Sequence, residues 1–137
     1  MPENALVISP ALNYIEDNYG TQFPVEKLAE VCHLSPTHFR RVFHSIMHTS
    51  PLNYLNSIRI MKACNLLRST EESILTISEL SGFASVSSFN RHFQEVIHQT
   101  PREYRTHSKP FTDASADDPR TTIIEFSGWM EPESDPY

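Results

Sequence analysis

Two short segments of the chain carry arginine, asparagine and hydroxyl side chains in a pattern suited to reading base pairs. Residues 36–47 and 86–97 each contain two phenylalanines four positions apart, which must face a core if the segments are helical. The outer faces then present Thr37, Arg40 and Arg41 in the first segment, and Val86, Ser87, Asn90 and Arg91 in the second. Arginine can chelate O6 and N7 of guanine, asparagine can pair with N6 and N7 of adenine, and a small side chain can meet a thymine methyl group.

A simpler interpretation is that these arginines only solvate an exposed helix face. For one isolated helix that interpretation would be preferred. Here the two faces stand in matching register, because Arg41 and Arg91 lie fifty residues apart and each follows an inward-facing phenylalanine by two positions. We therefore predict that both faces bind double-stranded DNA.

The two segments belong to a longer internal repeat. Residues 25–43 align with residues 74–93 after insertion of one residue, and the match continues to Tyr54 and Tyr104. Each copy predicts a short helix, a tight turn and a second helix with polar residues, which is the helix-turn-helix pattern. Solenoids need three or more copies to bury a core. Two copies therefore indicate a domain with two lobes.

A single helix is predicted between the two copies, over residues 51–68. Ser50 can cap its N-terminus and Pro51 suits the first helical position. Apolar residues recur at spacings of three and four over a wide arc, which indicates packing on both flanks. The opposite, polar side is predicted to hold Asn56, Arg59, Lys62 and Asn65. The sequence thus predicts an all-α fold of two helix-turn-helix subdomains joined by a central linker helix.

The ends of these helices and the turns between them can also be predicted. A first helix is expected to open at Ser9 and Pro10 and to stop at Gly20, and a second to begin at Pro24. Left-handed backbone is expected at the equivalent turn positions His33 and Gly82, and at the helix ends His48 and His98. Histidine is among the few residues other than glycine that are enriched at positive φ.

Residues 11–105 resemble the DNA-binding domain of the AraC/XylS family of bacterial transcription regulators. The most specific part of the resemblance is GFASVSSFNRHF followed by TPREYR, and IRIMKACNLL is similar to the family's linker helix. The resemblance implies about seven helices, the third and sixth entering successive major-groove segments. By position in the motif it implies base contacts from the seven outer-face residues named above. The chain departs from the family at His33, His48 and His98, commonly glycine, and at Ser78, commonly alanine.

Charge and composition suggest how the chain is divided. The net charge is −6, but residues 106–137 hold seven acidic and two basic residues, so the remainder is nearly neutral and can present a basic face locally. We expect residues 1–8 to be a linker or leader, 9–106 the bilobed DNA-binding domain, and 107–137 an acidic tail. The tail is expected to be partly disordered, or docked through a short strand at 121–130. No secretory signal or apolar stretch of about 18 residues is evident, so a cytoplasmic location is predicted.

Enzymatic and metal-binding functions are not favoured. His44 and His48 have zinc-ligand spacing but no second pair of ligands nearby, and Cys32 and Cys64 occupy apolar helical positions typical of buried thiols. With only three glycines the chain has no phosphate-binding loop, and no nucleophile–base constellation is visible. We predict no catalytic residues, no metal and no cofactor.

The expected partner is an asymmetric site in duplex DNA, with RNA polymerase as a second candidate. Members of the resembled family usually carry an effector-binding or dimerisation domain, and no part of this sequence resembles one. We therefore expect the chain to be either a C-terminal fragment or a stand-alone DNA-binding protein. The competing hypothesis is a helical protein-interaction module that acts on the transcription machinery without reading bases. It predicts that replacing Arg40, Arg41 and Arg91 together would leave function intact.

Overall fold

The computed structural model describes residues 2–108, with side chains from residue 6 onward, and this part of the chain is entirely helices and connections. The helices are α1 (Pro2–Asn18), α2 (Glu26–Val31), α3 (Pro36–Met47), α4 (Pro51–Ser69), α5 (Ile74–Leu80), α6 (Val86–Ile97) and α7 (Pro101–Ser108). The all-α prediction with seven helices is thereby confirmed. The predicted strand at 121–130 and nearly all of the predicted tail lie outside the described residues.

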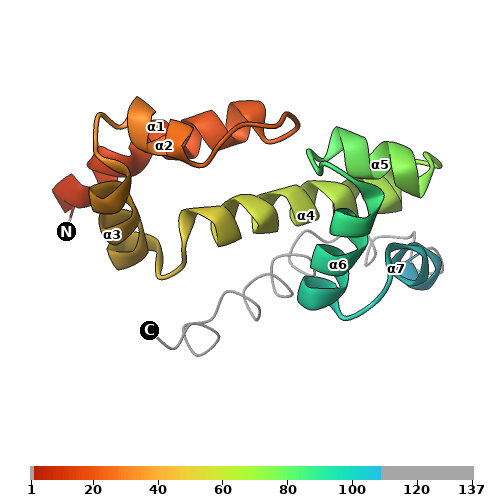
Figure 1. Ribbon diagram of the computed structural model, residues 1–137. Coiled ribbons are helices and arrows are strands. Elements are labelled where there is room, and N and C mark those ends of the chain that lie inside the picture. The colour runs from red at the N-terminus through yellow and green to blue at the C-terminus, as the bar shows by residue number, and fades with distance from the viewer. Residues whose placement is uncertain (1, 109–137) are drawn as a thin grey trace.

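The helices form two groups at the two ends of α4 (Figure 1). The first lobe consists of α1, α2, α3 and the N-terminal part of α4, and its buried core includes Ile8, Ile15, Leu28 and Leu55. The second lobe consists of the C-terminal part of α4 with α5, α6 and α7. Its core includes Ile60, Ala63, Cys64, Leu67 and Ile77. The bilobed arrangement predicted from the repeat is therefore confirmed.

Helix α4 belongs to both lobes. The Ser50 hydroxyl accepts a hydrogen bond of 3.1 Å from the backbone N–H of Asn53, and Pro51 occupies the first turn, as predicted. Leu55 is buried in the first core, and Ile60 is buried in the second. The same helix is thus the last helix of one lobe and the first helix of the other.

The start of α1 differs from the prediction. The helix begins at Pro2 and contains Pro10, whereas Pro10 was expected to open it. Proline removes one backbone hydrogen bond inside a helix. The residues on either side, Ile8, Ala11 and Ile15, are at most 1% exposed in the first core. Packing therefore holds the helix across its proline. The next helix, α2, begins at Glu26, two residues after the predicted start.

Serine caps fix the beginnings of α3, α5 and α6. The hydroxyls of Ser35, Ser73 and Ser85 each accept a hydrogen bond from the backbone N–H three residues later, at 3.2, 3.0 and 3.1 Å. Such caps satisfy a donor that the helix itself cannot satisfy. They place α3 and α6 at residues 36–47 and 86–97, the bounds that the sequence predicted.

Aromatic packing repeats between the lobes. The rings of Phe39 and Phe43 have centroids 5.5 Å apart, and those of Phe89 and Phe93 have centroids 5.6 Å apart. All four side chains are at most 1% exposed. Residues fifty positions apart in the sequence therefore occupy equivalent places in the two lobes.

Histidine occupies left-handed backbone at three positions. The φ angles are 59° at His33, 61° at His48 and 65° at His98, and φ is 96° at Gly82, as predicted for all four. The fourth departure from the family, Ser78, is accommodated differently. Its buried hydroxyl donates a hydrogen bond of 2.7 Å to the carbonyl oxygen of Leu75, so the polar group is satisfied inside α5.

The prediction for Arg59 is wrong. This residue was expected on the polar, exposed side of α4, yet it is 6% exposed. The connection between α1 and α2 covers it, and its guanidinium donates hydrogen bonds to backbone carbonyls of that connection. Burial lowers the pKa of the Arg59 guanidinium, but arginine stays charged in proteins.

Candidate nucleic-acid interface

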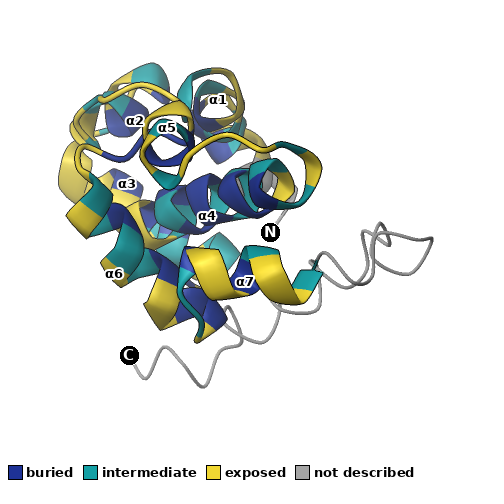
Figure 2. Cartoon of the chain, turned by 90° about the vertical axis from the view of Figure 1, so that its right-hand side faces the viewer, coloured by how far each residue is buried: buried dark blue, intermediate teal, exposed yellow. Residues whose placement is uncertain are grey.

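The two helices predicted to contact DNA bases are α3 and α6, called the reading helices below. They lie on the same side of α4. In Figure 1, α3 lies beside one end of α4 and α6 lies below its other half, while α1, α2 and α5 lie above it. The perpendicular view in Figure 2 agrees, with α3 and α6 together on one side and much of their outer surface exposed. One approaching surface could therefore contact both helices at once.

Each reading helix is fixed by its buried phenylalanines, which leaves the predicted residues outside. The exposed side chains are Thr37, Arg40, Arg41, Ser87 and Arg91. Val86 and Asn90 are only half-buried. All seven side chains predicted from the sequence thus lie at the surface, on two helices that the fold brings to one side. Their contact with bases stays a prediction.

A hollow of about 430 Å³ lies along α6, beside the start of α7. The stripe Val86, Asn90 and Gln94, at spacings of four, forms one of its walls, and Arg102 contributes from α7. The start of α7 is held by a reciprocal cap, because Thr100 and Glu103 exchange hydrogen bonds of 2.9 and 3.0 Å between side chain and backbone. An amide and a guanidinium beside Asn90 could contact a base edge or a phosphate.

Gln94 and Arg102 were not among the predicted site residues. Gln94 could have been found from its spacing of four after Asn90, which puts both on one stripe of α6. Arg102 had no comparable signal, because its place beside α6 depends on how α7 packs.

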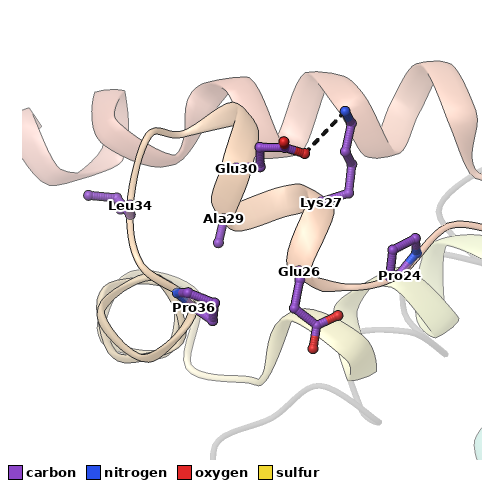
Figure 3. A pocket seen from close by; sticks show the side chains of 7 residues that line it. All are labelled: Pro24, Glu26, Lys27, Ala29, Glu30, Leu34 and Pro36. Atoms are coloured by element: carbon purple, nitrogen blue, oxygen red, sulfur yellow. Dashed lines mark ion pairs between the residues drawn. The ribbon is translucent and has the colours of Figure 1, made fainter.

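The reading helices hold fewer acidic residues than α1 and α2, which contain three and two. Helix α3 contains two arginines and no acidic residue, and α6 contains one acidic residue, Glu95. A second hollow, of about 440 Å³, lies against α2 and the start of α3 (Figure 3). Glu26, Lys27 and Glu30 line it, and the Lys27 Nζ lies 3.2 Å from a Glu30 carboxylate oxygen. Two carboxylates against one lysine disfavour phosphate, so the α2 hollow does not belong to a DNA-binding surface.

His92, the residue after Arg91, faces inward rather than toward a ligand. Its ring packs against the ring of Phe83 with centroids 5.7 Å apart. Burial lowers the pKa of His92; Glu95 opposes this shift and Arg91 adds to it. We therefore expect the imidazole to be neutral at pH 7 and to add no charge to the reading face.

Other chemistry finds little support in the described part of the chain. Within it, no group of three or more histidine, cysteine or acidic residues could hold a metal ion. Cys32, at the end of α2, and Cys64, inside α4, are buried free thiols, and burial raises the pKa of Cys32. None of the described helices has the length and apolarity needed to cross a membrane.

Several known proteins are similar to this chain in sequence and in fold. Residues 28–107 match the family described as helix-turn-helix domain. The transcriptional regulator AlkR of Acinetobacter baylyi is 34% identical over 74% of this chain and 33% of its own length. The DNA-binding domain of AdpA, solved in complex with a target DNA, superposes with a TM-score of 0.72 and 27% identity over 81% of this chain and 96% of that one. The chain belongs to the AraC/XylS family of helix-turn-helix transcriptional regulators.

Two further regulators are similar over about 70% of this chain. The bifunctional transcriptional activator and DNA repair enzyme AdaA of Bacillus subtilis is 32% identical over 70% of this chain and 46% of its own length. The C-terminal domain of the response regulator yesN from Fusobacterium nucleatum superposes with a TM-score of 0.67 and 32% identity, over 69% of this chain and 93% of that one. The chain spans about a third to a half of the length of AlkR and AdaA.

Proposed function

We propose that the chain binds one asymmetric site in duplex DNA as a monomer, with α3 and α6 in successive major-groove segments, and thereby regulates transcription in the cytoplasm. The observation that carries this proposal is the pairing of two equivalent helices, with polar outer faces, on one side of α4. The DNA-bound AdpA domain, which shares the fold, supports it.

A monomer is sufficient because both reading helices are in one chain. Dimeric helix-turn-helix proteins need two-fold symmetric operators, since each subunit supplies one recognition helix. Here α3 and α6 carry different outer residues, with Arg40 and Arg41 in one and Asn90 and Arg91 in the other. The two halves of the site should therefore differ in sequence.

The length of α4 suggests that the DNA bends. Its 19 residues correspond to about 28 Å, whereas one turn of B-DNA is about 34 Å. Because α3 and α6 are attached near the two ends of this helix, straight DNA would present its grooves too far apart. Bending a site of this size costs on the order of 1–6 kcal/mol, which the contacts of the second helix would have to offset.

A selection of bound sequences from random duplex DNA, using the full chain, tests this proposal. We expect a motif of two unequal parts, separated by about one helical turn. A triple variant, Arg40→Ala with Arg41→Ala and Arg91→Ala, should lose the enrichment while keeping its helical circular dichroism. A strictly palindromic motif, or no enriched motif from a folded chain, would contradict it.

The α2 hollow favours a second, compatible function as a protein contact. Its two carboxylates could receive a basic segment of the transcription machinery, such as RNA polymerase. A Glu26→Ala, Glu30→Ala variant should then lose activation of a reporter gene with its DNA affinity intact. Normal activation by that variant would exclude this role for the hollow.

A further inference from the structure

The two lobes touch directly, in addition to sharing α4. The connection between α1 and α2 runs along α4 and reaches the turn between α5 and α6 (Figure 1). In this contact the Gln22 side-chain amide donates a hydrogen bond to the carbonyl oxygen of Gly82. These residues are sixty positions apart and belong to different lobes, so the contact fixes one lobe against the other.

Arg59 lies at the centre of this contact. Its Nε donates to the carbonyl oxygen of Tyr19 and its Nη2 to that of Thr21, both at 2.8 Å. The guanidinium also lies over the ring of Phe23, 5.6 Å from the centroid. A planar guanidinium can hold two carbonyls and a ring at once because its donors form a rigid fork. Arg59 thus fastens the connection of the first lobe to the middle of α4.

Gly82 shows how closely the second lobe approaches. A Cβ atom at this position would lie 1.9 Å from the Tyr19 carbonyl oxygen and 2.7 Å from the Arg59 Nε. The equivalent residue of the first lobe is His33, which has a similar left-handed backbone but is exposed. Left-handed backbone alone therefore does not require glycine in this fold. Glycine is required at position 82 because the Tyr19 carbonyl occupies the space of a side chain.

We propose that Tyr19, Thr21, Gln22, Arg59 and Gly82 form an interlobe latch, which sets the spacing between the two DNA segments that the chain accepts. Gly82 is in the turn four residues before α6, so the latch holds the second reading helix in place relative to the first lobe. Arg59 is then a positioning residue for DNA recognition, although it contacts no DNA. This inference rests on the proposed function, since it concerns how the two reading helices are used together.

Arg59→Met is the informative variant, because methionine keeps an apolar stem in α4 and removes every donor. Each lobe has its own core, so both should stay folded. Arg68→Met is the matched control: Arg68 is also in α4, and its Nη1 donates to the Tyr104 hydroxyl at 2.6 Å, inside the second lobe. Gln22→Ala removes one hydrogen bond of the latch, the bond from the exposed Gln22 side chain to the Gly82 carbonyl oxygen. This variant should have the same effect as Arg59→Met, but a weaker one.

The first measurement is affinity for the selected site and for versions with one base pair added or removed between its halves. Each base pair moves one half by about 3.4 Å along the axis, so the wild-type chain should lose about tenfold in affinity at the altered spacings. Arg59→Met should reduce that discrimination to about threefold or less, with base preference within each half unchanged. The proposal would be overturned if Arg59→Met discriminated between spacings as strongly as the wild-type chain does. It would also be overturned if Arg68→Met lost discrimination to the same extent as Arg59→Met.

The second measurement needs no DNA. Spin labels at Ser45→Cys on α3 and Glu95→Cys on α6, in a chain with Cys32→Ala and Cys64→Ala, report the distance between the reading helices. We expect a narrow distance distribution that broadens with Arg59→Met and not with Arg68→Met; an unchanged distribution would overturn the latch. A wild-type chain that selects no sequence would overturn the proposed function and the spacing claim with it. A chain that selects two halves but accepts all spacings equally would overturn the spacing claim alone.

Discussion

Phe93 and Tyr104 pack edge to face with ring centroids 5.7 Å apart, and this contact joins the second reading helix to α7. The first lobe contains the same contact fifty residues earlier, between Phe43 and Tyr54, again with centroids 5.7 Å apart. In both lobes the tyrosine belongs to the helix that follows the reading helix. The orientation of each reading helix therefore depends on the helix after it.

Tyr104 should contribute to stability through its ring and its hydroxyl. Tyr104→Phe keeps the ring and removes the hydrogen bond from Arg68, so we expect a loss of about 1–2 kcal/mol in the free energy of unfolding. Tyr104→Ala also removes a ring that is 6% exposed, and should cost about 3–5 kcal/mol. Urea denaturation of the two variants measures both values. Equal losses would show that the ring contact contributes nothing.

Replacing histidine by glycine at the ends of the reading helices should stabilise the fold. His98 has φ of 65°, a conformation that costs side-chain-bearing residues roughly 1–2 kcal/mol. The greater freedom of glycine in the unfolded chain offsets part of this gain. His98→Gly should therefore raise the free energy of unfolding by about 1 kcal/mol. His38→Gly is the control, because His38 is exposed in the first turn of α3, where the backbone is right-handed and glycine should destabilise by up to about 1 kcal/mol.

Ser81 is a second position where substitution should increase stability. Its hydroxyl is buried and has no hydrogen-bond partner among the described residues. Leaving such a group unsatisfied costs roughly 1–3 kcal/mol, so Ser81→Ala should raise the melting temperature. Ser78→Ala, which removes a satisfied hydroxyl from the same region, should change it much less. A lower melting temperature for Ser81→Ala would mean that the hydroxyl is bonded in solution.

Arg41 and Arg91 should each read a base in their own half of the site. If each chelates a guanine, replacement by alanine should cost roughly 1–3 kcal/mol of binding and relax base preference in that half only. The two losses should be nearly additive, because the side chains are in separate lobes and share no partner. Binding-site selection with each variant measures this.

The salt dependence of the same variants distinguishes base contacts from phosphate contacts. If the arginines bind phosphates, each replacement should weaken all sequences about equally and reduce the salt slope by roughly one unit. No change in affinity, preference or slope in either variant would show that the reading-face assignment is wrong.

The reading helices could be predicted closely because their determinants are local. Ser35 and Ser85 cap the helices, and paired phenylalanines mark their inner faces, all within a few positions of sequence. The buried state of Arg59 could not be predicted in this way. Its partners are main-chain carbonyls about forty residues away. Every residue has such a carbonyl, so the residue types give no sign of the contact.

Tertiary packing also explains the other differences. Local preference favours Pro10 as a helix start, but burial of Ile8 and Ile15 on both sides of it outweighs that preference. Arg102 joins the hollow along α6 only because α7 packs across the end of that lobe. The sequence thus predicts which helices form and which faces of α3 and α6 are buried, while contacts between helices distant in sequence become visible only in the structure.

Helix α4 contributes buried residues to both cores, and this couples the unfolding of the two lobes. Leu55 supports one core and Ile60 the other, and barely more than one helical turn separates them. Melting the middle of this helix would expose apolar surface in both cores at once. Neither lobe can then open alone without weakening its neighbour, so we expect heat to unfold the two lobes in a single cooperative transition.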